Sequence, residues 1–231
     1  MYQLKENEML ITIFRFFSLS FVLLYVLSGT TLYAENSDEN KYSLRLGYGV
    51  SETTNLGEIL AGDWQRYEEK TSLLNLDAGY KLVSSVFDWP IDIYAKGSLS
   101  YFNEKGVSHY VSGEKSDDFL ELVLYFKAYW NIDFAGNRIR FGIGEGLSFA
   151  QEVPIVEIYD AMDENGLGPT SKTLNYLDIS LDIDIGRLFS VEALKDTYLG
   201  YTLKHRSGVF GLFNGVKGGS NYNMITLEKN I

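Results

Sequence analysis

A histidine and a serine lie two residues apart near the end of a predicted strand, at His205 and Ser207. Residues two apart in a strand point to the same face, and Leu199, Tyr201 and Leu203 share that face here. An imidazole can take the proton of a serine hydroxyl and turn the oxygen into a nucleophile. The apolar side of the strand thus carries a candidate base and a candidate nucleophile, which matters if that side contacts lipid.

The strand belongs to a series of eight segments in which apolar and polar residues alternate with the period of two that indicates strands. Most are about ten residues long, the length of a tilted strand that crosses a bilayer. One face of each segment is apolar, while the other carries charges such as Asp178 and Asp182, which a packed apolar core does not tolerate unpaired. The segments run at about 42–50, 74–82, 91–101, 120–130, 138–143, 177–185, 198–207 and 221–231.

We therefore expect an all-β fold, an eight-stranded antiparallel up-and-down transmembrane β-barrel with lipid outside and a polar interior. The interior charges, among them Asp178, Asp182, Asp184, Arg138, Arg140, Lys96 and Lys127, would form an ion-pair network. A soluble lipocalin-like barrel, with the apolar face turned inward around a cavity, would show the same alternation. Segment length, eight-fold repetition and aromatic residues near the segment ends favour the membrane barrel.

Long and short connections alternate along the chain, with long ones at about 51–71, 103–117 and 150–172. In outer-membrane barrels the short turns face the periplasm and the long loops face outward. With a periplasmic N-terminus, the seventh strand runs outward and ends with His205 and Ser207 level with the outer leaflet. An eight-stranded barrel is filled by its own side chains, so a transport pore is not expected.

The first 34 residues resemble a secretory signal peptide, with an apolar stretch from Leu10 to Leu27 and a small residue, Ala34, before a polar run. This divides the chain into a signal peptide (1–34) and an outer-membrane barrel (35–231); an uncleaved membrane anchor is the competing interpretation. The formal net charge of −11 argues against nucleic-acid binding. The absence of cysteine excludes disulfides, and no spacing suggests a metal or a cofactor.

Residues 203–208, the glycine-rich loop that follows, and residues 218–223 carry a family resemblance. Leu203-Lys204-His205-Arg206-Ser207-Gly208 and Gly218-Gly219-Ser220-Asn221-Tyr222-Asn223 resemble the C-terminal end of the outer-membrane lipid A 3-O-deacylase family (PagL-like, acyloxyacyl hydrolase-related). The resemblance is specific over about 199–223 and extends over 42–231 only at the level of the barrel. Residues 140–148 and 174–178 are weaker matches.

The resemblance implies a barrel enzyme that removes an ester-linked acyl chain from lipid A, with His205 as general base and Ser207 as nucleophile. The family's third catalytic member is a Glu fourteen residues after the His, a position that is Gly219 here. Family members also carry Asn after the Ser, where this chain has Gly208, so the oxyanion arrangement differs. If Ser207 pairs with Gly219, His205 falls opposite Asn221, whose amide oxygen could orient the imidazole in place of the Glu. Glu145 shares the outward face, but one strand lies between it and the histidine.

The sequence thus favours an outer-membrane lipid A deacylase-like barrel, a serine esterase acting on lipid A or a related outer-leaflet lipid. The alternative is a catalytically inactive structural or adhesion barrel of the same family, which the missing Glu supports, so enzymatic activity stays open. A soluble lipid carrier is a third class. The expected location is the bacterial outer membrane and the expected partner is lipopolysaccharide or another outer-membrane lipid; a homodimer is left open.

Overall fold

The computed structural model describes residues 40–65, 71–107, 115–164 and 166–231, and the expected signal peptide lies outside them. Eight long strands close into one antiparallel barrel in the order β1-β10-β9-β8-β5-β4-β3-β2. Each strand pairs with its neighbours along the chain, and β1 pairs with β10 to close the ring. The strands are β1 (Tyr42–Glu52), β2 (Ser72–Val83), β3 (Ile91–Asn103), β4 (Phe119–Phe134), β5 (Asn137–Ala150), β8 (Thr173–Asp184), β9 (Thr197–Ser207) and β10 (Gly219–Asn230). The expected up-and-down barrel is confirmed.

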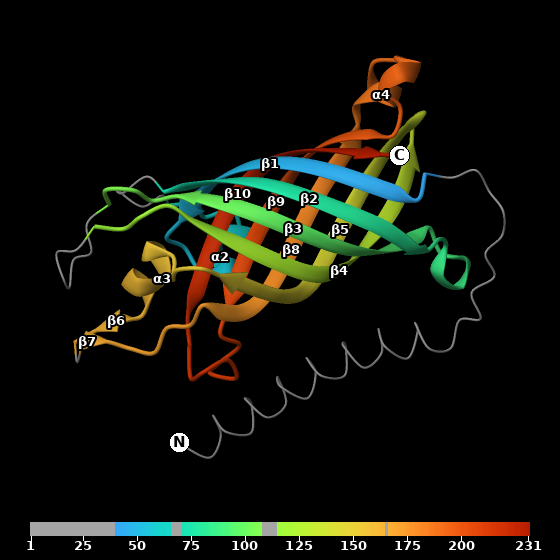
Figure 1. The fold of residues 1–231 in the computed structure, drawn as a ribbon. Helices are drawn as coiled ribbons and strands as arrows, with labels where there is room; N and C mark the ends of the chain where they lie inside the picture. The colour runs from blue at the N-terminus through green and yellow to red at the C-terminus, as the bar shows by residue number, and fades with distance from the viewer. Residues whose placement is uncertain (1–39, 66–70, 108–114, 165) are drawn as a thin grey trace. The chain divides into compact units, whose positions relative to one another are not determined.

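The connections differ in length between the two ends of the barrel (Figure 1). The short helix α3 (Ile155–Asp160), the hairpin of β6 (Met162–Asp163) and β7 (Gly166–Leu167), and the β9–β10 loop lie at one end. The opposite end carries η1 (Val86–Asp88) and α4 (Ile185–Leu188), with η2 (Glu192–Leu194) in the same turn as α4. The β1–β2 connection contains α2 (Leu56–Leu60). Among the described residues, no helix is both long and apolar enough to cross a membrane.

Charged side chains fill the interior of the barrel and pair with one another. Asp178 accepts from Arg45 at 2.7 Å and from Lys127 at 2.6 Å. Glu228 lies 2.8 Å from Lys96 and 3.3 Å from Arg140. A buried charge is tolerated only when it is paired and hydrogen-bonded, and these groups meet that condition. The polar face of the alternating pattern is therefore the inner face.

Two members of the expected interior network have other roles at the end with the short turns. Arg138 pairs at 2.8 Å with Asp133, and both side chains are partly exposed to solvent. Asp184 accepts the backbone N–H of Arg187 at 3.0 Å and caps α4. Arg138 therefore belongs to the rim, whereas Asp184, although it caps α4, is fully buried and pairs with Arg187 at 3.2 Å.

The outer face is a continuous apolar surface. Leucines at corresponding positions of neighbouring strands face each other in register, as Leu199, Leu227, Leu46, Leu76 and Leu99 do around five strands. A soluble protein rarely exposes a contiguous apolar patch larger than a few hundred Å². Exposed outward side chains include Leu44, Tyr48, Leu74, Tyr101, Leu122, Leu124, Phe126, Ile143, Leu181 and Ile225. The soluble lipocalin-like alternative would need this face inside, so the arrangement excludes it and defines a membrane-spanning barrel.

Helix α3 closes the barrel interior at the end with the long loops. The backbone N–H of Ile155 donates to Glu104 Oε2 at 3.0 Å. Glu157 accepts from Ser220 Oγ at 2.7 Å and pairs with Arg206 at 3.1 Å. Apolar side chains of the helix join an interior cluster formed by Leu73, Phe102, Phe119, Tyr222 and Met224 with Ile155 and Val156. The sequence did not predict this helix, which forms a plug in the mouth of the barrel.

Candidate functional site

His205 and Asn221 face each other across the β9–β10 pair on the outer face of the barrel. The register pairs Ser207 with Gly219 and His205 with Asn221, as the sequence predicted. Adjacent side chains in such a pair lie about 5 Å apart at Cβ, within reach of a direct hydrogen bond. The Nδ1 atom of His205 and the Oδ1 atom of Asn221 are 2.7 Å apart. Asn221 is therefore the residue that orients the imidazole.

The backbone of the segment after β1 determines which way the Asn221 amide points. Its Nδ2 atom donates to the carbonyl oxygen of Thr54 at 2.8 Å. A carbonyl only accepts, so the amide nitrogen must face Thr54 and the amide oxygen must face His205. That oxygen also only accepts, which places the imidazole proton on Nδ1. In this tautomer the Nε2 atom carries the lone pair that a general base requires, and the backbone of Ser220 also interacts with the ring.

Ser207 is the last residue of β9 and shares the outward register of His205. Its Oγ atom accepts the backbone N–H of Val209 at 3.1 Å. Among the described contacts, no hydrogen bond joins Ser207 to His205. Val209 and Phe210 both have positive φ, at 47° and 55°. A β-branched residue in this left-handed region is strained, which marks the turn directly after Ser207 as one held by its surroundings.

The segment after β1 covers part of the outer face around His205. Trp64 stacks on Tyr201 with ring centroids 5.9 Å apart, and Thr54 reaches Asn221 as described. Leu203 and Asn221 have outward register but are nearly fully buried. The outward placement that the sequence predicted is confirmed, but these groups are not bare to lipid as the remainder of the outer face is.

Gly219, the position that lacks the family's Glu, lies beside an acidic residue from another part of the chain. Its backbone N–H donates to Asp160 Oδ2 at 3.1 Å. A Cβ atom added at Gly218 would lie 1.7 Å from the same oxygen, so the carboxylate of Asp160 fills the space at this corner. The end of α3 thereby brings a carboxylate to the start of β10. Glu145, by contrast, is separated from His205 by Leu177, as expected.

Two carboxyl groups of the plug have perturbed proton affinity. Burial raises the pKa of Glu104 to about 8, although the hydrogen bond from the Ile155 N–H opposes this. Burial also raises the pKa of Glu157, and the positive charge of Arg206 acts in the opposite direction. Removing a carboxylate from water disfavours its charged form, which is the dominant cause in both cases. We therefore expect the contacts that hold the plug to depend on pH.

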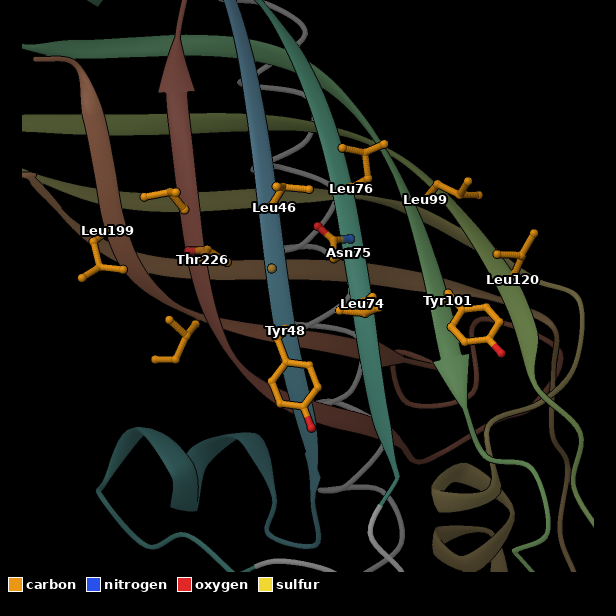
Figure 2. A pocket seen from close by; sticks show the side chains of 13 residues that line it. Leu46, Tyr48, Leu74, Asn75, Leu76, Leu99, Tyr101, Leu120, Leu199 and Thr226 are labelled. Atoms are coloured by element: carbon orange, nitrogen blue, oxygen red, sulfur yellow. The ribbon is translucent and has the colours of Figure 1, made fainter. Parts of the chain in front are cut away.

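A shallow apolar groove lies on the outer face (Figure 2). Figure 2 shows Leu46 and Tyr48 on β1 beside Leu74 and Leu76 on β2, with their side chains spread over the surface. Leu99, Tyr101, Leu120, Leu199, Ile225 and Leu227 also line the groove. Its lining is mostly apolar, as expected of a surface that contacts hydrocarbon chains. Within the described part of the chain, no three histidine or acidic side chains come together as a metal site requires.

The closed eight-stranded barrel, its apolar outer belt and its ion-paired interior define a membrane-spanning β-barrel of the outer-membrane type. No protein-family model matches the chain, and no curated protein matches it. Solved structures with a similar fold include two membrane proteins. The outer membrane enzyme PagL is 9% identical, with a TM-score of 0.49, covering 82% of this chain and 99% of that one. Neisserial surface protein A is 13% identical, with a TM-score of 0.46, covering 83% and 97%.

Proposed function

We propose that this barrel is a serine esterase of the bacterial outer membrane that hydrolyses an ester-linked acyl chain of lipid A or a related outer-leaflet lipid. Ser207 is the nucleophile, His205 the general base and Asn221 the residue that orients His205. The observation that carries the proposal is the 2.7 Å contact between His205 Nδ1 and Asn221 Oδ1, with the amide held by Thr54. Together these bonds leave Nε2 free to take a proton.

The chemistry proceeds by acyl transfer to the serine. Nε2 of His205 removes the proton from Ser207 Oγ, which attacks the ester carbonyl of the lipid, and the protonated imidazole then returns the proton to the leaving alcohol. Water hydrolyses the acyl-serine with the same base. In the resting site Ser207 Oγ accepts the Val209 N–H and makes no hydrogen bond to His205 among the described contacts, so its O–H must turn toward Nε2 before attack. On the inner face, ion pairs with Glu121 hold Lys204 and Arg206, which flank His205 in β9.

The second candidate is a non-enzymatic barrel that stabilises the envelope or serves in adhesion. The described contacts include no hydrogen bond between Ser207 and His205, and Ser207 Oγ accepts the Val209 N–H instead, which favours this candidate. Glycine at 219, where the family has Glu, favours it as well.

Mass spectrometry of lipid A separates the two candidates. The chain and its Ser207→Ala variant are expressed in a Gram-negative host, and heat-modifiable migration on a gel shows that both barrels are folded. The esterase predicts lipid A that lacks one acyl chain only when Ser207 is intact. Unchanged lipid A in the presence of a folded wild-type barrel would instead support the non-enzymatic role.

A further inference from the structure

Glu52 lies in the same cross-strand row as the proposed catalytic histidine. Glu52 on β1 is opposite Asn221 on β10, which is opposite His205 on β9. On the other side of the histidine, the row continues through Leu177 on β8 to Glu145 on β5. Two carboxyl groups therefore flank His205, each two strands away on the outer face. The position of Glu52 beside the site could not be predicted from the sequence, because the pairing of β1 with β10 joins the two ends of the chain.

The two carboxyl groups differ in their surroundings. Glu52 is only 4% exposed, and its Oε2 atom accepts no hydrogen bond from the described residues. Glu145 is half-buried. A buried carboxylate oxygen without a hydrogen-bond donor is costly, and a positive charge nearby would lower that cost. In the resting site the described residues of this row supply none.

A positive charge arises in this row when the reaction proceeds. On removing the proton from Ser207, His205 becomes an imidazolium, and Asn221 can orient that cation but, being neutral, cannot balance it. Two strand spacings place Glu52 and His205 about 10 Å apart at Cα, with only the Asn221 side chain between them. In a site shielded from water, charges at this separation interact appreciably.

Three other charged groups in the described part of the chain lie near His205. Asp160, at the end of α3, acts on it electrostatically but is exposed to solvent. Lys204 and Arg206 point to the inner face, where Glu121 and Glu157 balance them. On the side of β8, the neighbour is Leu177, which carries no charge.

We infer that Glu52 is a positioning residue of the hydrolase proposed above: its carboxylate stabilises the imidazolium form of His205 across Asn221. The inference rests on that proposed function. Glu52 makes no contact with the lipid and takes no proton from Ser207. Its effect is on the charge state of the base.

The experiment uses the full barrel folded in detergent and a long-chain alkyl fluorophosphonate, which labels activated serines without requiring the natural lipid. The rate of Ser207 labelling is measured by intact mass from pH 5 to pH 9. Glu52→Gln is expected to lower the plateau rate about 10-fold, since a charge at this separation contributes about that factor in a partly dry site. The acid limb of the profile is expected to move to lower pH, because the imidazole is then protonated less readily.

Glu145→Gln is the matched control, since it removes a carboxyl group from the same row at the same strand separation. It is expected to change the profile less than Glu52→Gln, because Glu145 is only half-buried and its charge is screened more strongly than that of the buried Glu52. Glu52→Asp keeps the charge and is expected to restore the wild-type acid limb. A uniform loss of rate at every pH in Glu52→Gln, or an acid limb in the wild-type place, would overturn the inference while leaving the esterase intact. If wild-type protein is not labelled at Ser207 at all, the esterase itself is wrong.

Discussion

Asn221 and His205 meet across the β9–β10 pair, with 2.7 Å between amide oxygen and imidazole Nδ1. The amide nitrogen of Asn221 is occupied by the carbonyl of Thr54, a residue that directly follows β1. The orientation of the imidazole therefore depends on closure of the barrel, because β1 reaches β10 only when the ring is complete. If His205 is the base proposed above, closing the barrel also positions it.

Replacing Asn221 should disable the base without unfolding the barrel. Asn221→Leu removes the acceptor for the Nδ1 proton, so the tautomer with a free Nε2 loses its preference. We expect hydrolysis or serine labelling to fall by about 100-fold, within the range that general-base catalysis contributes. Asn223→Leu is the matched control, two residues further on the same face, where the amide accepts from Tyr201 instead. Equal losses in both variants would show that Asn221 has no specific role.

The stability of the plugged barrel should fall as pH rises from about 4.5 to 8. The pKa of Glu104 in the folded protein is about 8, above the ordinary value near 4.5, so the folded state holds its proton more tightly than the unfolded state. The stabilisation is complete below the ordinary value and is lost as pH rises through the folded value. Urea unfolding in lipid vesicles at pH 5, 7 and 9 measures this. Glu104→Gln should flatten the dependence; an unchanged slope would contradict the assignment.

Removing Arg206 should cost far more stability than removing a rim arginine. Arg206→Met leaves the buried Glu157 without its ion-pair partner, which costs ~3–5 kcal/mol when one member of a buried pair is lost. Arg138→Met breaks a partly exposed pair with Asp133 and should cost less than ~1 kcal/mol. The free energy of unfolding from urea titration compares them. Similar costs would contradict the plug as a buried, ion-paired element.

A charge placed on the outer belt should oppose insertion into lipid. Leu46 lies near the middle of β1 and is exposed on the outer face. Leu46→Arg should destabilise the inserted barrel by ~2–4 kcal/mol, the cost of an arginine near the bilayer midplane. Leu60→Arg, in the exposed helix α2 of a loop, should have little effect. Folding into vesicles, followed by heat-modifiable migration, distinguishes them, and equal tolerance would contradict the membrane-spanning orientation.

The barrel could be predicted from sequence because its two faces see different solvents. Alternation located all eight strands, and the pairing of Ser207 with Gly219 followed from the short distance along the chain between β9 and β10. Local patterns suffice for neighbouring strands. They also sufficed for the outward placement of His205.

The rest of the site depends on contacts between distant parts of the chain. Thr54 and Glu52 reach Asn221 through the closing pair of β1 and β10, and Asp160 reaches Gly219 from a helix inside a long loop. None of these relationships between distant residues leaves a periodic signal in the sequence. Arg138 was assigned to the interior from alternation alone, which does not show where a strand leaves the filled part of the barrel.

The most direct measurement of the central claim is the release of fatty acid by the purified barrel. Wild-type protein and Ser207→Ala are reconstituted with lipid A in mixed micelles, and free fatty acid is measured by mass spectrometry over time. The account predicts catalytic release of one acyl chain per lipid by the wild type and none by the variant. Equal release from both, or none from a folded wild-type barrel, would contradict it.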